Sequence, residues 1–132
     1  MARKRVLIVE DNPMNRDLLS QLLENVCDVV TAANGLEAVE TAQREHPDLI
    51  LMDLSMPILN GWDATVVLKR RPQTRQIPVV AVSARTMREE IARAERAGCD
   101  DFVPLPLDES RFFSVVGRHL RLPSRPVAAE SC

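Results

Sequence analysis

Three acidic side chains follow short apolar runs of the sequence, a placement typical of functional carboxylates in α/β proteins. Asp53 comes directly after the run 49–52, and Glu10 and Asp11 come directly after the run 6–9. Continuous apolar runs of this length indicate strands that are buried on both faces of a parallel sheet. The carboxyl ends of such strands are where ligands bind in open α/β sheets. One aspartate at a strand end is common, so the rest of the chain decides whether Asp53 is functional.

The remaining segments predict strands and helices in strict alternation. Apolar runs predict strands at 6–9, 29–32, 49–52, 79–82 and 101–104. Capping residues followed by amphipathic segments predict helices at 13–26, 36–44, 62–70, 86–97 and 108–120. Repeated strand–helix units of this kind indicate a parallel sheet joined by right-handed crossovers.

Two of the predicted helices carry specific expectations about their faces. Asn12 is expected to cap the first helix, with Pro13 at its first position. Its apolar stripe is expected to comprise Met14, Leu18, Leu19, Leu22, Leu23 and Val26. Thr86 is expected to cap the fourth helix, which would turn Met87, Ile91 and Ala94 inward and pair Glu89 with Arg93.

The predicted fold class is a flavodoxin-like, doubly wound five-stranded parallel sheet of order 2-1-3-4-5, with helices on both faces. This order fits a central first strand and a weak second strand, at 29–32, on an edge. The first and third strands are then neighbours. Glu10, Asp11 and Asp53 are therefore expected to converge at one switch point of the sheet.

Three converging carboxylates repel one another, and a hard divalent cation bound through oxygen relieves that repulsion. Mg²⁺ suits a site with few protein ligands and an incoming phosphate. Ser83, at the end of the fourth strand, supplies a hydroxyl beside the same edge, although a capping or loop serine is the commoner interpretation. The sequence has no glycine-rich phosphate loop, no H-E-x-x-H and no G-x-S-x-G, so nucleotide, zinc and serine-hydrolase chemistry lack residues here.

Composition sets the broad class of protein. The 132 residues are 45% hydrophobic and 27% charged, as in ordinary globular proteins, and we expect one domain over residues 1–122 with a flexible tail over 123–132. A formal charge of −2 gives no case for a nucleic-acid or membrane surface. Cys27, Cys99 and Cys132 have no metal-ligand or redox spacing, so we expect reduced thiols in a cytoplasmic protein.

Four motifs now make a family resemblance specific. They read V-L-I-V-E-D-N-P-M-N-R, L-I-L-M-D-L-S-M-P-I-L-N-G, P-V-V-A-V-S-A and A-G-C-D-D-F-V-P-L-P. In order and spacing the chain resembles the receiver domains of two-component response regulators, from Arg5 to about Leu120. It is similar to single-domain receivers, namely stand-alone cell-cycle regulators, and to the receivers of hybrid kinases.

The resemblance implies a phosphorylation site and a signalling role, not an enzyme. Asp53 would accept a phosphoryl group from a phosphohistidine on a sensor histidine kinase or a histidine phosphotransfer protein. Asp11, Asp53 and the carbonyl of Ser55 would hold Mg²⁺, and Glu10 would act mostly through a bound water. Ser83 and Ala84 would bind the phosphoryl group, and Ser83 and Phe102 would form the switch. An unknown downstream protein would bind the face of the fourth helix, fifth strand and fifth helix, where arginines gather.

One motif residue departs from the family pattern. Receivers ordinarily have lysine before the proline that follows the fifth strand, and this chain has Leu105 there. The two lysines of the chain, Lys4 and Lys69, are not placed to substitute. Arg85 is the nearest plausible cation in sequence, although a solvated loop arginine is the commoner interpretation. The resemblance also implies a cis peptide bond between Leu105 and Pro106.

Two alternatives to a phosphorylated receiver stay open. The loss of the lysine favours a pseudo-receiver, a protein-binding module that works without phosphorylation, whereas the retained acids and Ser83 argue against it. A small phosphatase or transferase working through an aspartyl phosphate would need a second acid for leaving-group protonation. Ser55 occupies the obvious nearby position instead.

Overall fold

The computed structural model of the chain describes residues 3–121, so the expected tail lies outside the described residues. Five strands are present, namely β1 (Arg5–Val9), β2 (Asp28–Ala32), β3 (Leu49–Met52), β4 (Val79–Ser83) and β5 (Asp101–Pro104). The helices are α1 (Pro13–Leu23), α2 (Gly35–Glu45), α3 (Gly61–Arg70), α4 (Arg88–Ala97) and α5 (Glu109–Leu120). Each predicted strand and helix is confirmed, with shifts of a few residues at some ends.

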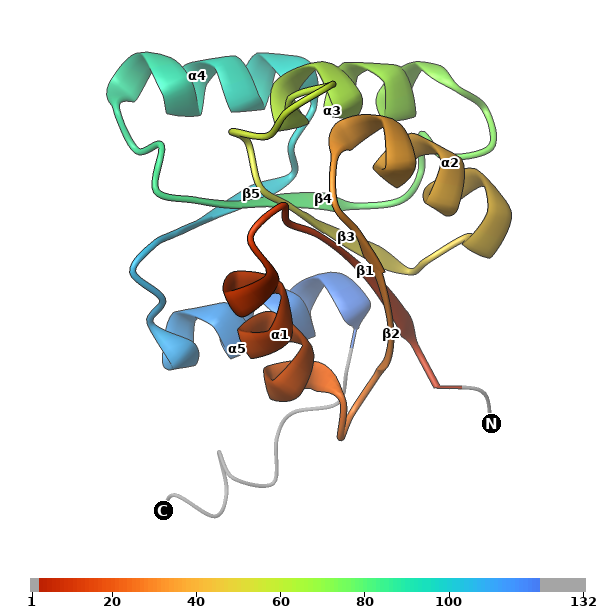
Figure 1. The fold of residues 1–132 in the computed structure, drawn as a ribbon, viewed down its shortest axis with the longest axis vertical. Coiled ribbons are helices and arrows are strands. Elements are labelled where there is room, and N and C mark those ends of the chain that lie inside the picture. Colours follow the sequence, from red (N-terminus) through yellow and green to blue (C-terminus); the bar gives the residue numbers. More distant parts are fainter. Residues whose placement is uncertain (1–2, 122–132) are drawn as a thin grey trace.

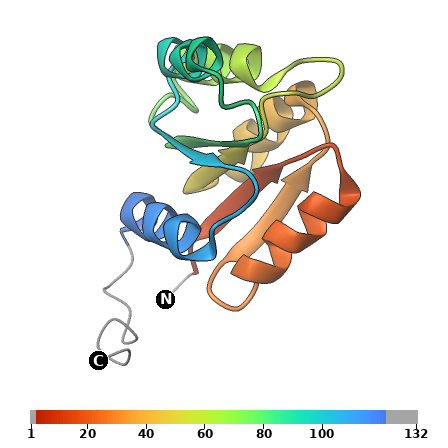
Figure 2. The same ribbon diagram turned by 90° about the vertical axis from the view of Figure 1, so that its left-hand side faces the viewer.

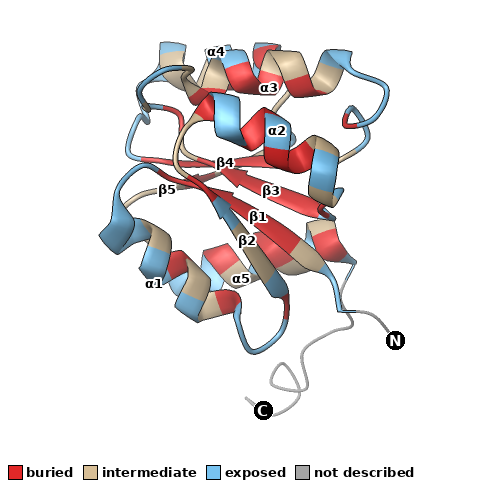
Figure 3. Ribbon diagram, turned by 45° about the vertical axis from the view of Figure 1, so that its right-hand side comes forward, coloured by how far each residue is buried: buried red, intermediate tan, exposed pale blue. Residues whose placement is uncertain are grey.

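The strands form one parallel sheet in the order β2-β1-β3-β4-β5, which confirms the predicted fold class (Figure 1). Helices α1 and α5 cover one face of the sheet, and α2, α3 and α4 cover the other (Figure 2). The central strands β1, β3 and β4 are buried nearly throughout, as Figure 3 shows in red. A strand covered on both faces needs apolar side chains in both directions, and this explains the continuous apolar runs.

Side chains of β1 alternate between two hydrophobic cores. Val6 and Ile8 join the core under α1 and α5. Leu7 and Val9 join the core under α2 and α3. The two cores hold the sheet between rigid layers, so the loops at the carboxyl ends of the strands start from fixed positions.

Asparagine or aspartate side chains cap the N-termini of four of the five helices. The Oδ1 atom of Asn12 accepts a hydrogen bond from the Met14 amide at 2.8 Å, which confirms the predicted cap of α1. Asn34, Asn60 and Asp108 cap α2, α3 and α5 in the same way. These side chains satisfy amide donors that have no partner within the helix.

The predicted cap of α4 is wrong. Helix α4 begins at Arg88, and Met87 is its N-cap residue instead of Thr86. The Glu90 carboxylate reaches back and accepts a hydrogen bond from the Met87 amide at 3.1 Å, so a threonine cap is not needed. Met87 is consequently 72% exposed and does not point inward. Among the described residues no ion pair joins Glu89 to Arg93, because Arg93 extends to Asp63 on α3.

The apolar face of α1 is also narrower than the sequence pattern predicts. Leu19 and Leu23 are buried, whereas Met14 and Leu18 are 80% and 47% exposed. Val26 lies beyond the helix, which ends at Leu23. Leu22 is half-buried against the core under α1 and α5, so the sheet covers Leu19, Leu22 and Leu23, whereas Met14 and Leu18 face outward.

Gly61 fixes the loop that carries Asp53, and its substitution should be costly. A Cβ atom at Gly61 would lie 2.1 Å from the Asp53 carbonyl oxygen and 2.8 Å from the Leu54 Cα, which are backbone atoms. Overpacking of this kind costs about 1–3 kcal/mol, so we expect Gly61→Ala to lower the free energy of unfolding by at least that amount. Urea denaturation followed by circular dichroism measures the loss.

Gly117, in the middle of α5, provides the matched control. A Cβ atom there would have no heavy atom within 4 Å. Gly117→Ala should therefore stabilise the protein by about 0.5–1 kcal/mol through helix propensity. Equal effects of the two substitutions would show that the close approach at Gly61 is not a constraint.

Candidate functional site

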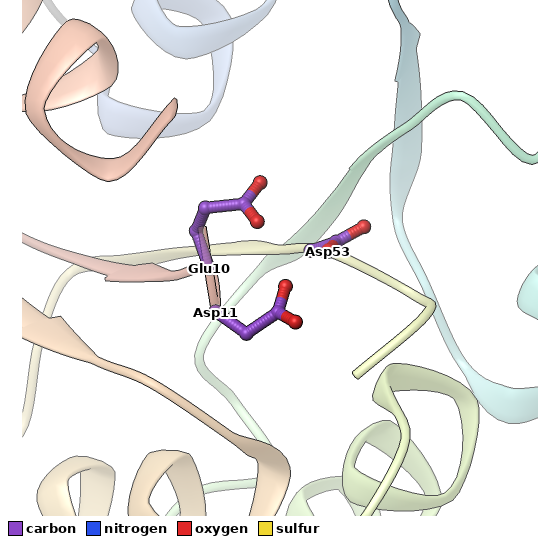
Figure 4. Close-up of side chains that lie close together, drawn as sticks. All are labelled: Glu10, Asp11 and Asp53. Carbon is purple, nitrogen blue, oxygen red and sulfur yellow. The ribbon is translucent and has the colours of Figure 1, made fainter. Parts of the chain in front are cut away.

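The candidate site lies where β1 and β3 end side by side. The register pairs Val9 with Met52, and the Asp53 amide donates a hydrogen bond to the Val9 carbonyl at 2.9 Å. This pairing places Asp53 opposite the acidic pair Glu10 and Asp11. One carboxylate oxygen from each acid lies within 4.8 Å of the others. Figure 4 shows the three side chains gathered at the ends of the two strands. The predicted convergence of the three acids is therefore confirmed.

Burial and mutual repulsion act on these carboxylates together. Glu10 is only 3% exposed, and this burial raises its pKa to about 7, with the charges of Asp53 and Asp11 adding to the effect. The main-chain amide of Asn12 donates a hydrogen bond to Oε2 of Glu10 at 3.1 Å and offsets part of the rise in pKa. Burial also raises the pKa of Asp53, helped by the Asp11 charge and opposed by the Ser55 amide. Ionisation of these acids is therefore unfavourable in the folded protein, and a bound cation would offset the repulsion between their charges.

The donor set fits a small divalent cation. All three acids offer oxygen, which is the ligand atom that Mg²⁺ and Ca²⁺ prefer. Mg²⁺ in particular keeps several waters and uses only one or two carboxylates of the protein. The spacing of these oxygens leaves room for an ion between them.

An open cleft of about 290 Å³ surrounds the acids. It is lined by Glu10, Asp11, Asn12, Asn15, Asp53, Ser55, Ser83, Ala84, Arg85 and Leu105. The structure therefore gathers at one place every site residue predicted from the sequence except Phe102. Asn12 was predicted only as a helix cap and Asn15 was missed. Their positions in the first turn of α1, directly after the acid pair, were the available signal.

Phe102 lies outside the cleft, on β5 opposite α4. It lines a separate cavity of about 160 Å³ together with Ile91, Ala94, Glu95, Cys99, Asp100 and Asp101. Its ring is half-buried and packs against the small cluster of Leu54, Ala81 and Ala94. Leu54 follows Asp53 directly, so this cluster joins the site to the face of α4.

Ser83 carries a buried hydroxyl at the end of β4 and is not a helix cap. It ends β4, and its Oγ accepts a hydrogen bond from the Arg85 amide at 3.0 Å. Helix α4 starts only at Arg88. An accepting hydroxyl retains its own O–H bond for donation, so Ser83 can still donate to a ligand in the cleft.

Leu105 lines the same cleft as Asp53. Its side chain is half-buried and packs against the core under α5, and its amide donates to the Ser83 carbonyl at 3.0 Å. The Leu105–Pro106 peptide bond is cis, as predicted. Lys69 binds Asp100 and the Ile77 carbonyl, which precede β5 and β4. Lys4 precedes β1, so both lysines of the chain lie at the opposite edge of the sheet.

Comparison with known proteins identifies the class. Residues 6–116 match the response regulator receiver domain family, and the chain belongs to that family of two-component signalling proteins. It is 37% identical over 118 residues to the polar-differentiation response regulator DivK of Brucella ovis, covering 89% of this chain and 96% of that protein.

Solved structures agree with this assignment. The receiver domain of the sensor histidine kinase PA1611 from Pseudomonas aeruginosa, with a magnesium ion coordinated in its active-site cleft, matches with a TM-score of 0.85 and 29% identity over 91% of this chain and 99% of that one. Vibrio cholerae chemotaxis protein CheY4 matches with a TM-score of 0.83 and 25% identity over 89% and 98%. No helix among residues 3–121 has the length and apolar character required to cross a membrane.

The raised pKa of Glu10 gives the metal-free protein a specific pH dependence. In the folded state the pKa of Glu10 is about 7, so it stays protonated up to about that pH, whereas in the unfolded chain Glu10 ionises near its ordinary pKa of 4.5. The stabilising contribution of the protonated form is therefore complete below about pH 4.5 and is lost as the pH rises through 7. Glu10→Gln removes this titration and retains an acceptor for the Asn12 amide.

We expect Glu10→Gln to be more stable than the natural protein at pH 8 by about 1–3 kcal/mol, and the difference to shrink toward pH 5. Urea titrations in EDTA at several pH values measure the difference. A stability difference that stays constant from pH 5 to pH 8 would contradict the assignment of the raised pKa to Glu10.

Proposed function

We propose that this receiver accepts a phosphoryl group on Asp53 from a phosphohistidine, with Mg²⁺ bound at the acidic site, and signals through the face formed by α4, β5 and α5. The observation that carries the proposal is the convergence of Glu10, Asp11 and Asp53 beside the Ser83 hydroxyl in one open cleft. Phosphoryl transfer depends on positioning and charge neutralisation more than on covalent help from the protein, and this cleft provides for both.

In the proposed step an Asp53 carboxylate oxygen attacks phosphorus. A P–O bond forms as the P–N bond of the phosphohistidine breaks, and the electron pair of that bond stays on the imidazole nitrogen. The product is an acyl phosphate. The Ser83 hydroxyl and the Ala84 amide, both from residues that line the cleft, would donate to phosphoryl oxygens. Mg²⁺ supplies positive charge that offsets the phosphoryl group and the acids.

The metal ligands in this proposal come from two loops. Asp11, Asp53 and the main-chain carbonyl of Ser55 would bind Mg²⁺ directly, and Glu10 would bind it through water. The chemistry of the donors supports this set, as does the magnesium in the cleft of the PA1611 receiver.

The donor would be a sensor histidine kinase or a histidine phosphotransfer protein. A likeness to part of a Dictyostelium discoideum hybrid signal transduction histidine kinase, 38% identical over 119 residues, supports this class of partner. A cytoplasmic location belongs to the same proposal. The free thiols of Cys27 and Cys99 support a reducing compartment.

The downstream signal would leave through Phe102 and its surroundings. The cavity beside the ring gives it space to change rotamer, and Arg111 donates to the Phe102 carbonyl at 2.9 Å. Arg118 and His119 of α5 both contact the Asp101 carboxylate. A rotation of Phe102 would therefore disturb a polar surface that a downstream protein can bind.

One observation favours a second candidate function. Leu105 removes the usual phosphate-binding ammonium, which favours a pseudo-receiver that binds its partner without phosphorylation. Such a module has no requirement for a metal or for the Asp53 carboxylate. Phosphorylation and metal binding therefore separate the two functions.

Incubation with acetyl phosphate and Mg²⁺ should add the mass of one phosphoryl group to the natural protein and none to Asp53→Asn. Of the three acids, only Asp53 follows β3, and it lies on the side of the cleft where Ser83 lies. Its carboxylate is therefore the expected phosphoacceptor. Intact-protein mass spectrometry makes the measurement. Asp17→Asn, at an exposed position of α1, is the matched control and should be modified like the natural protein. Absence of the adduct in the natural protein would favour the pseudo-receiver.

Mg²⁺ should bind weakly, and Asp11→Asn should weaken it by about tenfold or more, because it removes one charged ligand. Amide chemical shifts of the β1–α1 and β3–α3 loops, followed during a Mg²⁺ titration, report the affinity. Asp17→Asn again serves as the control. Unchanged binding in Asp11→Asn would place the metal away from the three acids.

A further inference from the structure

The cleft carries more negative than positive charge. Unless the chain supplies a cation, bound Mg²⁺ would have to neutralise this charge alone. Three carboxylates converge there, and Leu105, which also lines the cleft, offers only an aliphatic side chain. A phosphoryl group adds roughly −1.5 to −2 charges at neutral pH. Among the residues that line the cleft, Arg85 is the one cation.

Arg85 reaches across the mouth of the cleft. Its backbone is anchored in the β4–α4 loop, where its amide donates to Ser83 Oγ at 3.0 Å. Its Nη2 lies 3.5 Å from Oγ of Ser55, which is two residues beyond Asp53 in the β3–α3 loop. The guanidinium group therefore spans the two loops between which a phosphoryl group on Asp53 would sit.

The present partner of Arg85 is a weak one. Nη1 of Arg85 contacts Oε2 of Glu90 at 3.4 Å, and the Arg85 side chain is 54% exposed. Exposed ion pairs of this length contribute little, because solvent screens them and both side chains lose freedom. A phosphoryl group offers the planar guanidinium two acceptors side by side, which is a stronger arrangement.

We propose that Arg85 is the phosphate-binding cation of this receiver, in place of the lysine that Leu105 replaces. On phosphorylation of Asp53 its guanidinium group exchanges the Glu90 carboxylate for the phosphoryl oxygens. This inference rests on the proposed phosphorylation of Asp53. Lys4 and Lys69 are held at the other edge of the sheet, and Arg16 is engaged with the Glu10 carbonyl at 2.9 Å, so none of them competes for this role.

The exchange would have a local readout. Glu90 is also the residue whose main-chain carbonyl accepts a hydrogen bond from Trp62 Nε1 at 3.1 Å. Arg93 lies over the same indole ring, 4.5 Å from its centroid. Release of the Glu90 carboxylate by Arg85 would therefore change the surroundings of Trp62, the single tryptophan of the chain.

Beryllofluoride, which occupies the place of a phosphoryl group on an aspartate, is the probe. We expect Arg85→Gln to weaken beryllofluoride binding at saturating Mg²⁺ by about tenfold or more, the usual effect of a lost charge-assisted hydrogen bond. Arg85→Lys keeps the charge but cannot offer two parallel donors, so it should bind more tightly than Arg85→Gln and less tightly than the natural protein. Arg88→Gln removes the same charge from an exposed position that does not line the cleft, and it should bind like the natural protein. Fluorine NMR gives the affinities, and Trp62 fluorescence reports the exchange.

Two further variants test the exchange itself. Glu90→Gln weakens the competing partner but keeps an oxygen for the Met87 amide, so it should tighten beryllofluoride binding. Leu105→Lys, introduced into Arg85→Gln, should restore the lost affinity by placing a cation at another position that lines the cleft. Mg²⁺ affinity measured without beryllofluoride should be similar in all of these variants.

The outcomes separate this inference from the function on which it rests. If Arg85→Gln and Arg88→Gln bind beryllofluoride equally, Arg85 is not the phosphate-binding cation, although Asp53 can still be phosphorylated. If the natural protein neither binds beryllofluoride nor gains a phosphoryl group by mass, the proposed function fails and the role of Arg85 fails with it.

Discussion

The parallel pairing of β1 with β3 is the interaction on which the site depends. It aligns Val9 with Met52 and thereby brings the acids that follow each strand to one edge. The pairing is stabilised by side chains that enter the two cores on either face of the sheet. The same arrangement buries Glu10 and forces its carboxylate close to two others, a local repulsion that the surrounding packing must overcome. Stability of the sheet and reactivity of its edge are therefore linked in this fold.

The acids of the cleft and its candidate phosphate-binding donors come from different strands. The acids come from β1 and β3, whereas the donors that would face a phosphoryl group come from the loop after β4. In this chain Leu105, in the loop after β5, lines the cleft with an aliphatic side chain, which has no hydrogen-bond donor. Neutralisation of a phosphoryl group would therefore depend on the loop after β4 and on the bound cation.

Continuous apolar runs made the fold and the acidic cluster predictable from sequence. A fully buried strand has a distinctive composition, and strand order then decides which strand ends meet. The faces of α1 and α4 could not be predicted as well. Met14 and Leu18 have the spacing of core residues, yet the sheet covers only the neighbouring row. Thr86 has the chemistry of a cap, but the helix begins after Met87, whose amide donates to the Glu90 carboxylate instead. The direction of the Arg85 side chain depends on Glu90 and Ser55, which the sequence does not place beside it.

The β3–α3 loop is fastened at both ends. At its start the Gly61 amide bonds to the Leu54 carbonyl at 2.9 Å, and near its end the Leu59 carbonyl accepts the Gly35 amide of α2 at 2.9 Å. Only a short arch remains between these points, and Ile58 on it is 77% exposed with a φ of 70°. A segment held in this way has little conformational freedom left to lose when a ligand arrives. The entropy cost of ordering the loop is met when the protein folds, so a ligand that binds in the cleft meets a surface that is already ordered.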